Sequence, residues 1–513
     1  MSRPRISHAL VCFVIASDLI WASRLLGDAK LTLTIKDSDG QPIPARVHLR
    51  DEAGQAVKSL GLSDRLDHLN VDGEQTVSVP PGTYKYSVER SPEWEQVSGE
   101  VTIADGDTKM VAVVLTRLVD LTQTEWYSGD LHIHRDPELI EQLLRASDLH
   151  IGPVITWWNE RNHWKDRDLP TSNLLQFDGN RFAHLMAGED EREGGALLYF
   201  GLEKPLDITG SSREFPSPMT FVQRARERQT ALHLDIEKPF WWDVPIWLAL
   251  AKPDTVGLAN NHMCRDRMYE DEAWGRPRDA ERLTSPRGNG YWTQELYYHI
   301  LNTGLRIAPS AGSASGVLPN PVGYNRVYVH VDGELTWDKW WSGLRAGRSF
   351  VTNGPVLECR ANGEIPGTVF QGDGTRPFRV SLDMTLTSQD RVKEVEVIQN
   401  GEVVLSLPCD EQSSHQLTAE LTIQGSGWFL VRAITDNPRT FRFASTAPFY
   451  VELGEQPRRI SRASCQFFLD WIDERMQRVP DKLIDPDQLE TVLASHKQAR
   501  DFWRQRLMTA TNL

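Results

Sequence analysis

The sequence is poor in cysteine and in long apolar runs, and both absences restrict the class of protein. Five cysteines occur among 513 residues, and no two of them have the CxxC spacing of zinc or redox motifs. After the N-terminal segment, no stretch approaches the roughly 20 apolar residues that a transmembrane helix needs. We therefore expect no membrane span. The four later cysteines are expected to be isolated buried thiols, with a disulfide as the alternative in an exported protein.

Basic residues are also in the minority. The chain has 56 Lys and Arg against 71 Asp and Glu, which gives a net charge of −15. Nucleic-acid binding needs a basic stripe to contact phosphates, and no run of Lys or Arg provides one. Walker A and dinucleotide-binding glycine patterns are absent as well. With 40% hydrophobic residues, the composition is that of a folded globular protein that does not bind nucleic acid.

Residues 1–28 are predicted to be a secretory signal peptide. Arg3 and Arg5 precede the apolar run of residues 9–16, which is the order of charge and hydrophobicity in such signals. Asp18 interrupts the pattern, and small residues allow more than one cleavage site. The alternative is the N-terminus of a cytoplasmic protein. We expect an exported protein, periplasmic or extracellular.

The pattern of strands and helices divides the remaining chain into four segments. Short alternating strands with regular turns predict a β-sandwich over residues 29–118. Apolar strand-like runs alternate with helical stretches over residues 119–355, which predicts a β/α domain with parallel strands. Alternation returns over residues 356–454 and predicts a second β-sandwich, followed by a helical tail over residues 455–513. The expected fold class is multidomain α/β plus β.

Two local signals support these boundaries. Asn400-Gly401 lies between two alternating runs and favours a type I′ hairpin turn. Asp485 can cap a helix that has Pro486 at its first position and Gln488 at its third. The apolar stripe of this helix predicts that it docks on the body of the protein, because its polar face is not basic enough for a membrane surface.

Ligand-type residues follow several predicted strands between Trp126 and Trp341, an interval that holds twelve of the seventeen Trp and nine of the fourteen His. His132 and His134 are two residues apart, so a strand would point both to one face, with Asp130 behind them to orient a ligand. The ends of parallel strands meet at one rim, where residues remote in sequence can share a metal. The same spacing recurs at Glu189 and Glu191 and at His233, Asp235 and Glu237, and His262 follows a further strand. The alternative for each residue alone is a satisfied core histidine or a solvated carboxylate.

The order of the motifs GDLHIH, GED and LH on a β/α domain behind a small β-sandwich resembles the polymerase-and-histidinol-phosphatase (PHP) superfamily of metallohydrolases, especially its carbaryl-hydrolase-like branch. The resemblance covers about residues 126–355. It implies a distorted (β/α)7 barrel, similar to a TIM barrel, with up to three divalent metals that activate water against phosphate, carboxylic or carbamic esters. It assigns His132 and His134 to the first motif, Glu189 to the bridging glutamate and His233 to a later histidine.

Two motifs depart from the family pattern. Thr156-Trp157-Trp158-Asn159 stands where the family usually has Thr-Asp-His-Asn, and Gly312-Ser-Ala-Ser-Gly316 stands for Gly-Ser-Asp-Ser-His. Four ligands are therefore missing, and a trinuclear centre is not expected. The remaining residues predict one metal site with an open position. Its expected ligands are His132, His134, Glu189 and His233, with His262 as a replacement.

The predicted function is an exported hydrolase of ester or phosphoester bonds with a mononuclear metal site. Zinc is the expected metal, with manganese or iron as alternatives, and it would lower the pKa of its water to about 7. Glu191 or Asp235 is the expected base, and Arg135 is expected to stabilise anionic charge.

Two other functions remain open. The first is a barrel without catalysis that binds a saccharide-like small molecule through a pocket lined by Trp157, Trp158, Trp241 and Trp242. The second is a structural module in which the tryptophans fill the core, as Trp337, Trp340 and Trp341 are expected to do.

Overall fold

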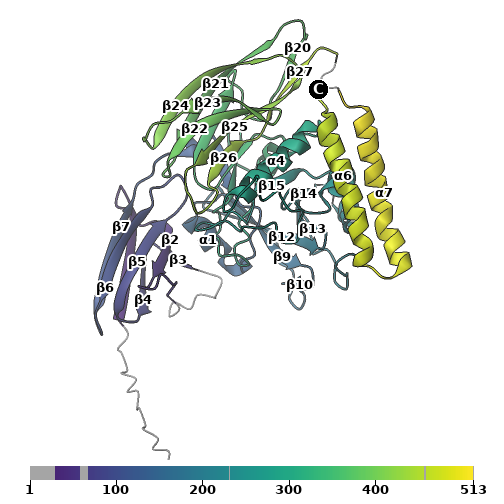
Figure 1. Ribbon diagram of the computed structural model, residues 1–513. Coiled ribbons are helices and arrows are strands. Elements are labelled where there is room, and N and C mark those ends of the chain that lie inside the picture. The colour runs from purple at the N-terminus through teal and green to yellow at the C-terminus, as the bar shows by residue number, and fades with distance from the viewer. Residues whose placement is uncertain (1–28, 58–66, 230, 456–457, 512–513) are drawn as a thin grey trace, which may run out of the picture.

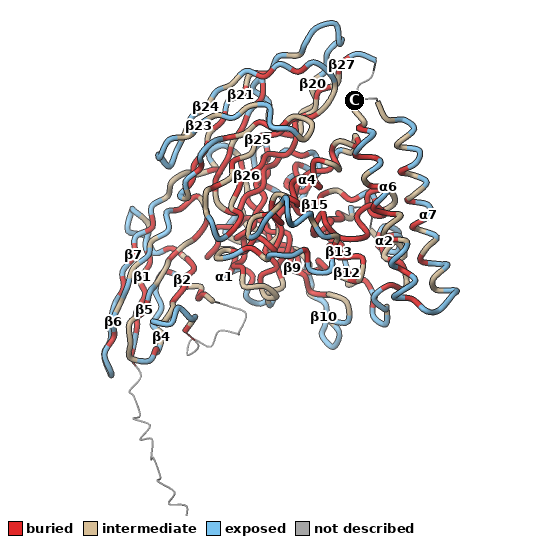
Figure 2. Tube along the Cα trace, viewed as in Figure 1, coloured by how far each residue is buried: buried red, intermediate tan, exposed pale blue. Residues whose placement is uncertain are grey.

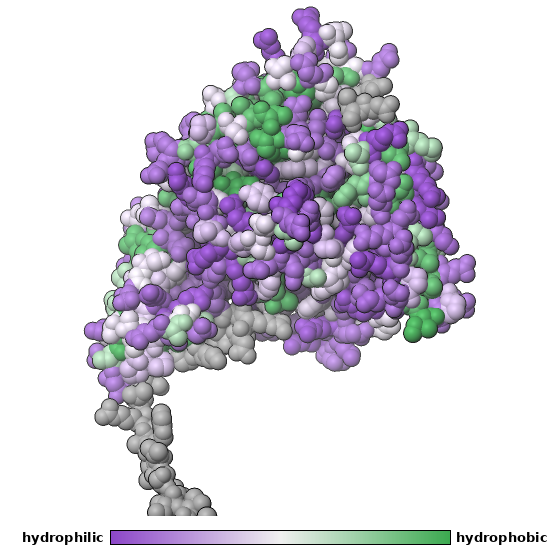
Figure 3. All heavy atoms as spheres, viewed as in Figure 1, coloured by the Kyte–Doolittle hydropathy of each residue, from purple (hydrophilic) through white to green (hydrophobic). Residues whose placement is uncertain are grey.

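The computed structural model describes residues 29–57, 67–229, 231–455 and 458–511 (Figure 1). The predicted signal peptide lies outside these residues. Strands form the bulk of the molecule, and buried residues concentrate in the central strands and on the helix faces turned toward them (Figure 2). The visible surface is mainly hydrophilic, with hydrophobic patches over the C-terminal strands and at the turn end of the last two helices (Figure 3).

The N-terminal strands form two sheets with a common core, which is the sandwich-like arrangement that the alternation predicts. Leu31 and Leu33 from one sheet and Val47 and Leu49 from the other belong to this core, because every second side chain of a strand points to the same face. The three-stranded sheet contains β1 (Ala29–Asp37), β4 (Glu74–Val79) and β7 (Thr108–Leu115), and the four-stranded sheet contains β2 (Pro44–Arg50), β3 (His68–Asp72), β5 (Gly82–Glu89) and β6 (Val97–Ile103).

The middle of the chain is only partly parallel. Six strands run in one direction, since the pairs β8–β9, β9–β12, β14–β15 and β15–β16 are parallel and β13 pairs antiparallel with both β12 and β14. The strands are β8 (Trp126–Gly129), β9 (Ile151–Trp158), β12 (Arg181–Arg192), β13 (Gly195–Phe200), β14 (His233–Ile236), β15 (Thr255–Ala259) and β16 (Ala308–Ala311).

The expectation of parallel strands is wrong for four strands, β10 (Arg161–Asn162), β11 (Leu174–Phe177), β13 and β17 (Arg326–His330). Only Glu193 and Gly194 separate β12 from β13, and so short a connection can join only antiparallel neighbours. β17 runs antiparallel to β8 and leads into β18 (Ser349–Thr352). The short strands β10 and β11 also pair antiparallel, with β9 and β12.

Helices separate these strands along the chain. They are α1 (Ile140–Ala146), α2 (Pro218–Arg228), α3 (Val244–Ile246), α4 (Gly288–Asn302) and α5 (Trp337–Arg345). Pro218 occupies the first turn of α2, where a missing N–H costs nothing, and Ser217 caps the helix by accepting the Met219 amide. Trp340 and Trp341 on α5 are buried in the central core and Trp337 packs against it, as the sequence predicts.

The C-terminal strands enclose a core of their own but stay joined to the central sheet, because β26 pairs with β18. The predicted hairpin is confirmed, since Asn400 and Gly401 both have positive φ between β22 and β23. The strands are β19 (Val356–Ala361), β20 (Val369–Gly372), β21 (Phe378–Thr387), β22 (Val392–Gln399), β23 (Glu402–Pro408), β24 (Ser414–Ile423), β25 (Gly427–Thr435), β26 (Phe443–Thr446) and β27 (Phe449–Leu453).

Two C-terminal helices pack along one side of the molecule (Figure 1). α6 (Arg462–Arg478) and α7 (Pro486–Met508) form a hairpin, and Asp485 caps α7 by accepting the amides of Asp487 and Gln488, as predicted. Trp503 donates to the Pro245 carbonyl at 2.9 Å, which docks α7 on the central domain. In the described parts of the chain, no helix has the length and apolarity needed to cross a membrane.

The described cysteines are all free, as expected. Cys264, Cys359 and Cys465 are buried and Cys409 is partly buried. Burial raises the pKa of the Cys264 thiol to about 12, so this thiol stays protonated at neutral pH.

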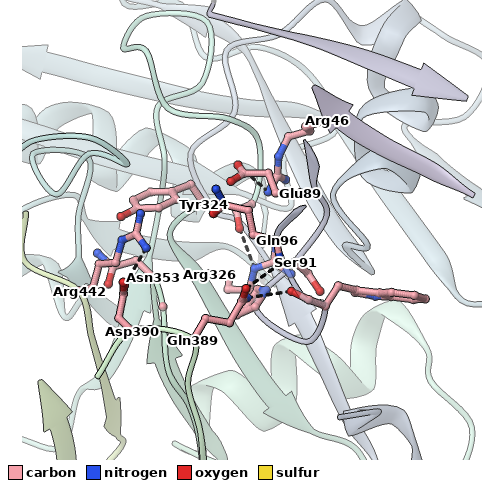
Figure 4. Close-up of a pocket in the computed structure, with 14 residues that line it drawn as sticks. Arg46, Glu89, Ser91, Gln96, Tyr324, Arg326, Asn353, Gln389, Asp390 and Arg442 are labelled. Atoms are coloured by element: carbon pink, nitrogen blue, oxygen red, sulfur yellow. Dashed lines mark hydrogen bonds and ion pairs between the residues drawn. The ribbon is translucent and has the colours of Figure 1, made fainter. Parts of the chain in front are cut away.

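The three strand-rich regions meet around a polar cavity of about 300 Å³ (Figure 4). Gln389, in the turn between β21 and β22, accepts the Gln96 amide at 2.7 Å and donates to the Trp94 carbonyl at 2.8 Å. Arg442 pairs with Asp390 across 2.7 Å on the same wall. The two bonds of Gln389 hold the C-terminal strands directly against the N-terminal sandwich.

Candidate metal centre

The histidine pair follows β8 in an extended segment. Ile133 bridges to Val154 on one side and to Ser315 on the other, so its neighbours His132 and His134 both point away from this apolar side chain. Asp130 accepts the backbone amides of His132 at 3.0 Å, Ser313 at 3.0 Å and Gly323 at 2.7 Å. Asp130 therefore holds the backbone of the histidine segment, which is an indirect form of the orienting role expected for it.

Three of the predicted ligands converge. His132 Nε2 lies 2.9 Å from His134 Nε2 and 3.4 Å from Glu189 Oε2. His134 Nε2 lies 3.0 Å from the same carboxylate oxygen. His132 and Glu189 are buried and His134 is partly buried. The sequence prediction that the ends of β8 and β12 bring these residues together agrees with this geometry.

Glu237 supports the group from behind. Its Oε1 lies 3.4 Å from Nδ1 of His132, the ring nitrogen that faces away from Glu189. The carboxylate is fixed by Lys238 at 2.5 Å, by the Trp241 indole N–H at 2.9 Å and by the Asn261 amide at 2.7 Å. A carboxylate on the second nitrogen of a histidine sets its tautomer and leaves the other nitrogen free as a ligand. A solvated carboxylate was the alternative for Glu237 in the sequence, and the structure instead buries this side chain.

The charges within the group depend on one another. Burial opposes the charged form of His132, but Glu189 and Glu237 together raise its pKa to about 10. Burial lowers the pKa of His134, which favours its neutral form. Burial alone would raise the pKa of Glu189, yet the two imidazoles hold it well below its usual range. Without a metal, the group consists of the His132 imidazolium, the neutral His134 imidazole and the Glu189 carboxylate. A metal ion that binds His132 must therefore displace a proton from this ring.

The structure does not bring His233 to this group. His233 is the first residue of β14, whereas Glu237 directly follows the last one. Four residues of strand span about 13 Å, so the two side chains lie at opposite ends of the strand. His233 bonds Thr255 at 2.8 Å and packs against Trp341, with ring centroids 4.6 Å apart.

His262 also lies outside the group. It follows β15, at the expected end of the sheet, but its Nδ1 lies 3.1 Å from the Asp271 carbonyl and its ring packs between Phe240 and Tyr269. Burial lowers the pKa of His262 to about 3, so it is a neutral core histidine. His262 is therefore a satisfied core histidine, which was the alternative expected for a histidine taken alone.

The two candidate bases differ in surroundings. Glu191 lies two residues after Glu189 on β12 and accepts the Trp158 indole N–H at 3.1 Å. Asp235 is buried and accepts the hydroxyls of Thr255 and Ser310. Burial raises the pKa of each carboxyl to about 7. Glu191 remains partly exposed, so it is the more accessible of the two.

A cavity of about 540 Å³ opens beside His134. Trp158 lines it and packs on His134 with ring centroids 4.9 Å apart, and the Arg161 guanidinium lies 4.9 Å from the centroid of the Trp158 ring. Arg135 also lines the cavity, and its buried Nη1 atom has no hydrogen-bond partner among the described residues. Arg192, in contrast, is paired with Asp190 at 2.7 Å. Arg135 is therefore a cation without a counter-charge at the edge of the candidate site.

The four tryptophans predicted to line one pocket have three different places. Trp157 and Trp158 line the cavity beside His134, although most of Trp157 packs against Gly188 and Tyr199. Trp241 is buried and holds Glu237. Trp242 packs beneath Arg478 of α6, 4.0 Å from ring to guanidinium, and belongs to the core.

Two further groups combine histidine with carboxylates. His48, Asp67 and His68 lie in the N-terminal sandwich, with Nδ1 of each histidine within 3.2 Å of Asp67 Oδ1. No sequence motif indicates this group, because His48 lies on β2 whereas His68 begins β3 and Asp67 directly precedes it. Glu125, His330 and Asp332 form a third, more exposed group.

Comparisons with known proteins assign no family. No protein-family model and no curated protein matches the chain. A minor pilin of Streptococcus agalactiae aligns with 18% of this chain and 47% of its own, at 21% identity and a TM-score of 0.17. A Niemann-Pick type C2 protein from the Japanese carpenter ant aligns with 20% of this chain and 91% of its own, at 9% identity and a TM-score of 0.12. Both likenesses are too weak to carry an argument about the fold or the function.

Proposed function

We propose that the protein is a metal-dependent hydrolase of ester or phosphoester bonds. One divalent metal ion, with zinc as the expected metal, is held by His132, His134 and Glu189. The observation that carries the proposal is the convergence of three ligand atoms whose separations are 2.9, 3.0 and 3.4 Å. We further propose that residues 119–355 are a divergent PHP-type barrel and that the protein is exported. The motif order and the N-terminal charge pattern support these two points.

The spacing and chemistry of the donor set fit a divalent metal. Zinc lies about 2.0–2.2 Å from imidazole nitrogen and carboxylate oxygen, so two ligands at the tetrahedral angle are about 3.3–3.6 Å apart. Of the observed separations, 3.4 Å lies in this range, and 2.9 and 3.0 Å lie within about 0.4 Å of it. Glu189 Oε2 is buried and accepts no well-formed hydrogen bond within the described chain, although buried polar atoms are nearly always paired. Two imidazoles and one carboxylate leave a position for water or substrate.

The side chains around the group have separate tasks in this proposal. A bound metal would polarise the substrate carbonyl or phosphoryl oxygen and lower the pKa of a water molecule. Glu237 holds the proton on Nδ1 of His132, so that Nε2 presents its lone pair. Glu191, oriented by Trp158, accepts a proton from water during attack. Arg135 binds an anionic group of the substrate, because no carboxylate in the described chain neutralises it.

Ligand binding without catalysis is the second candidate function. Trp157 and Trp158 stand where the resembled family has two metal ligands, and both line the cavity beside His134. Large aromatic faces favour contact with flat ligands, including the apolar faces of sugars. In this case the cavity would bind a saccharide-like molecule without turnover.

Metal analysis of the purified chain tests the proposal. We expect about one equivalent of divalent metal in the parent, and a loss of affinity of more than about 100-fold in the double variant His132→Ala/His134→Ala. His415→Ala, on β24 outside the central sheet, is the matched control and should keep its metal. Less than about a tenth of an equivalent in the parent, after incubation with zinc, manganese or iron, would overturn the metal site.

Turnover separates the two candidate functions. The parent is assayed with phosphate, carboxylate and carbamate esters against the double variant. Turnover in the parent alone supports the hydrolase. Metal binding without turnover on any of these esters favours the ligand-binding alternative. Full metal content in the double variant would show that the metal is held elsewhere.

A further inference from the structure

A second cavity lies at the opposite end of the central strands from the candidate metal centre. It has a volume of about 250 Å³ and is lined by residues of β12, β13, β14 and α5. His233, which the sequence analysis assigned to the metal, lines this cavity as the first residue of β14. Since β14 carries Glu237 just beyond its other end, the two sites are separated by the length of the strand.

Aromatic rings form the walls of this cavity. Trp337 and Trp341 project from the same face of α5, because they are four residues apart, and their ring centroids are 5.4 Å apart. His184 lies nearly parallel to Trp337, with centroids 5.4 Å apart and an interplanar angle of 20°. Phe200 contacts Trp341 at 5.2 Å. Trp337 is only partly buried, so its ring is the part of the wall nearest to solvent.

His233 presents a hydrogen-bond acceptor within these walls. When Asp235 is ionised, Thr255 donates its hydroxyl proton to this carboxylate at 2.6 Å and therefore accepts from Nε2–H of His233, at 2.8 Å. The proton of His233 is therefore on Nε2, and Nδ1 carries a lone pair. Nδ1 is buried and has no hydrogen-bond partner among the described residues. A buried acceptor without a partner costs free energy that a ligand donor would recover.

His184 presents the complementary donor. Its Nδ1 accepts the Met186 backbone amide at 3.4 Å, so its proton lies on Nε2. The rim carries charges of both signs, from Glu203, Asp338 and Arg345, with one more acid than base. This balance does not favour an anion. An uncharged ligand that both donates and accepts hydrogen bonds matches the lining.

We propose that this cavity is a binding site for a neutral sugar of one pyranose ring, stacked on Trp337 with one hydroxyl donating to Nδ1 of His233. The volume agrees with a ligand of one ring, because a cavity of about 150 Å³ already accepts benzene. Hydroxyl groups supply the donor that His233 lacks and an acceptor for His184. The site is independent of the proposed hydrolase, since no residue of one lines the other.

The experiment uses the full chain and methyl β-D-glucopyranoside as the probe, with methyl β-D-galactopyranoside as a second pyranose and phenol as a flat aromatic competitor. Saturation-transfer NMR and titration report binding. We expect a dissociation constant near 1 mM for a ligand of this size. Trp337→Ala should weaken sugar binding at least about tenfold. Trp337→Phe should weaken it less, because this variant keeps a ring face for the sugar to contact.

Two controls keep the test decisive. Trp274→Ala removes a partly exposed tryptophan that packs on Trp241, away from α5, and should bind the sugar like the parent. Trp158→Ala alters the cavity beside His134. Binding that is lost in Trp158→Ala and kept in Trp337→Ala would overturn the proposal, as would phenol binding without pyranose binding. No pyranose signal at about 10 mM would overturn it as well. If Trp337→Ala does not fold, the same comparison is made with Trp337→Phe.

Discussion

Two groups in this molecule contain two histidines and one carboxylate, yet their surroundings differ. His132, His134 and Glu189 lie at the ends of the central strands, and His48, Asp67 and His68 lie in the N-terminal sandwich. Glu237 adds a second carboxylate to the first group. In the second group, Arg50 binds Asp67 at 2.9 Å. With all imidazoles neutral, Glu189 and Glu237 against Lys238 leave one net negative charge in the first group. In the second group, Asp67 against Arg50 leaves none.

The second group continues into a network of ion pairs. Glu89 Oε1 lies 3.1 Å from His48 Nε2 and 3.3 Å from Arg46, and Glu89 Oε2 accepts from Arg265 at 3.0 Å. Arg265 belongs to the loop after β15, so these bonds join the sandwich to the central domain. The comparison teaches that ligand-type residues at suitable distances are not enough for a metal site. The charges of the neighbouring side chains decide between a metal ligand and an ion pair.

Removing the charge of Glu89 should have the largest effect. In Glu89→Gln, Arg46 and Arg265 lose their carboxylate inside the protein, and breaking a buried pair in this way costs about 3–5 kcal/mol. We expect the free energy of unfolding to fall by this amount in urea denaturation, with or without a chelator present. If the free energy of unfolding falls only when metal is present, the second group is a metal site, and the two groups do not differ in the way described above.

The same network predicts acid sensitivity. Burial opposes the ionisation of Glu89, but Arg265 and His48 hold its pKa well below the usual range. The charge of Glu89 therefore stabilises the fold fully at pH values above the pKa that glutamate has in the unfolded chain, about 4.3. This stabilisation is lost as the pH falls toward the lower pKa of Glu89 in the folded protein. Glu89→Gln should flatten the decline of stability below about pH 4.

Removing the support behind His132 should have an intermediate effect. Glu237→Gln keeps the shape of the side chain but weakens its hold on Nδ1 of His132, and such changes lower metal affinity about 10–100-fold. Competition with a metal-binding dye measures this affinity. Asp235→Asn, which alters a buried carboxyl bonded to hydroxyls rather than to His132, is the comparison variant. Equal losses of metal affinity in Glu237→Gln and Asp235→Asn would show that the burial of a carboxyl, and not its contact with His132, governs the affinity.

Arg50→Ala should have the smallest effect. Arg50 is about one-third exposed, with 34% of its side chain accessible, and exposed ion pairs contribute about 0–1 kcal/mol. We expect a decrease in unfolding free energy within this range and unchanged metal content. If the variant instead gains a second equivalent of metal, the positive charge at Asp67 is what keeps a cation out of the second group.

Local patterns in the sequence predicted local features well. The spacing of His132 and His134, the turn at Asn400-Gly401 and the cap at Asp485 each depend on backbone geometry within a few residues. The structure agrees at all three positions. Glu189 was also predicted, from its spacing to Glu191 near an expected strand end and from the resemblance to the PHP family. It lies near the end of β12, which runs parallel to β8.

Other residues of the site could not be assigned from the sequence. His233, Asp235 and Glu237 share one face in the alternating pattern, but the sequence does not say at which residue this strand begins and at which it ends. The structure places Glu237 beside His132 and His233 at the other end. The choice between a metal ligand and a core residue at His262 likewise depended on Phe240 and Tyr269, which pack against it in the fold.

The sequence by itself determined the alternation of strand-rich and helical regions, the small number of thiols and the histidine pair, because these depend on composition and on contacts between near neighbours. The tertiary structure alone decided the antiparallel course of β13 and β17 and the union of the C-terminal strands with the central sheet. It also decided which histidine group has arginines beside its carboxylates. The physical reason is that charge balance and burial depend on side chains brought together from distant parts of the chain, and no local pattern specifies them.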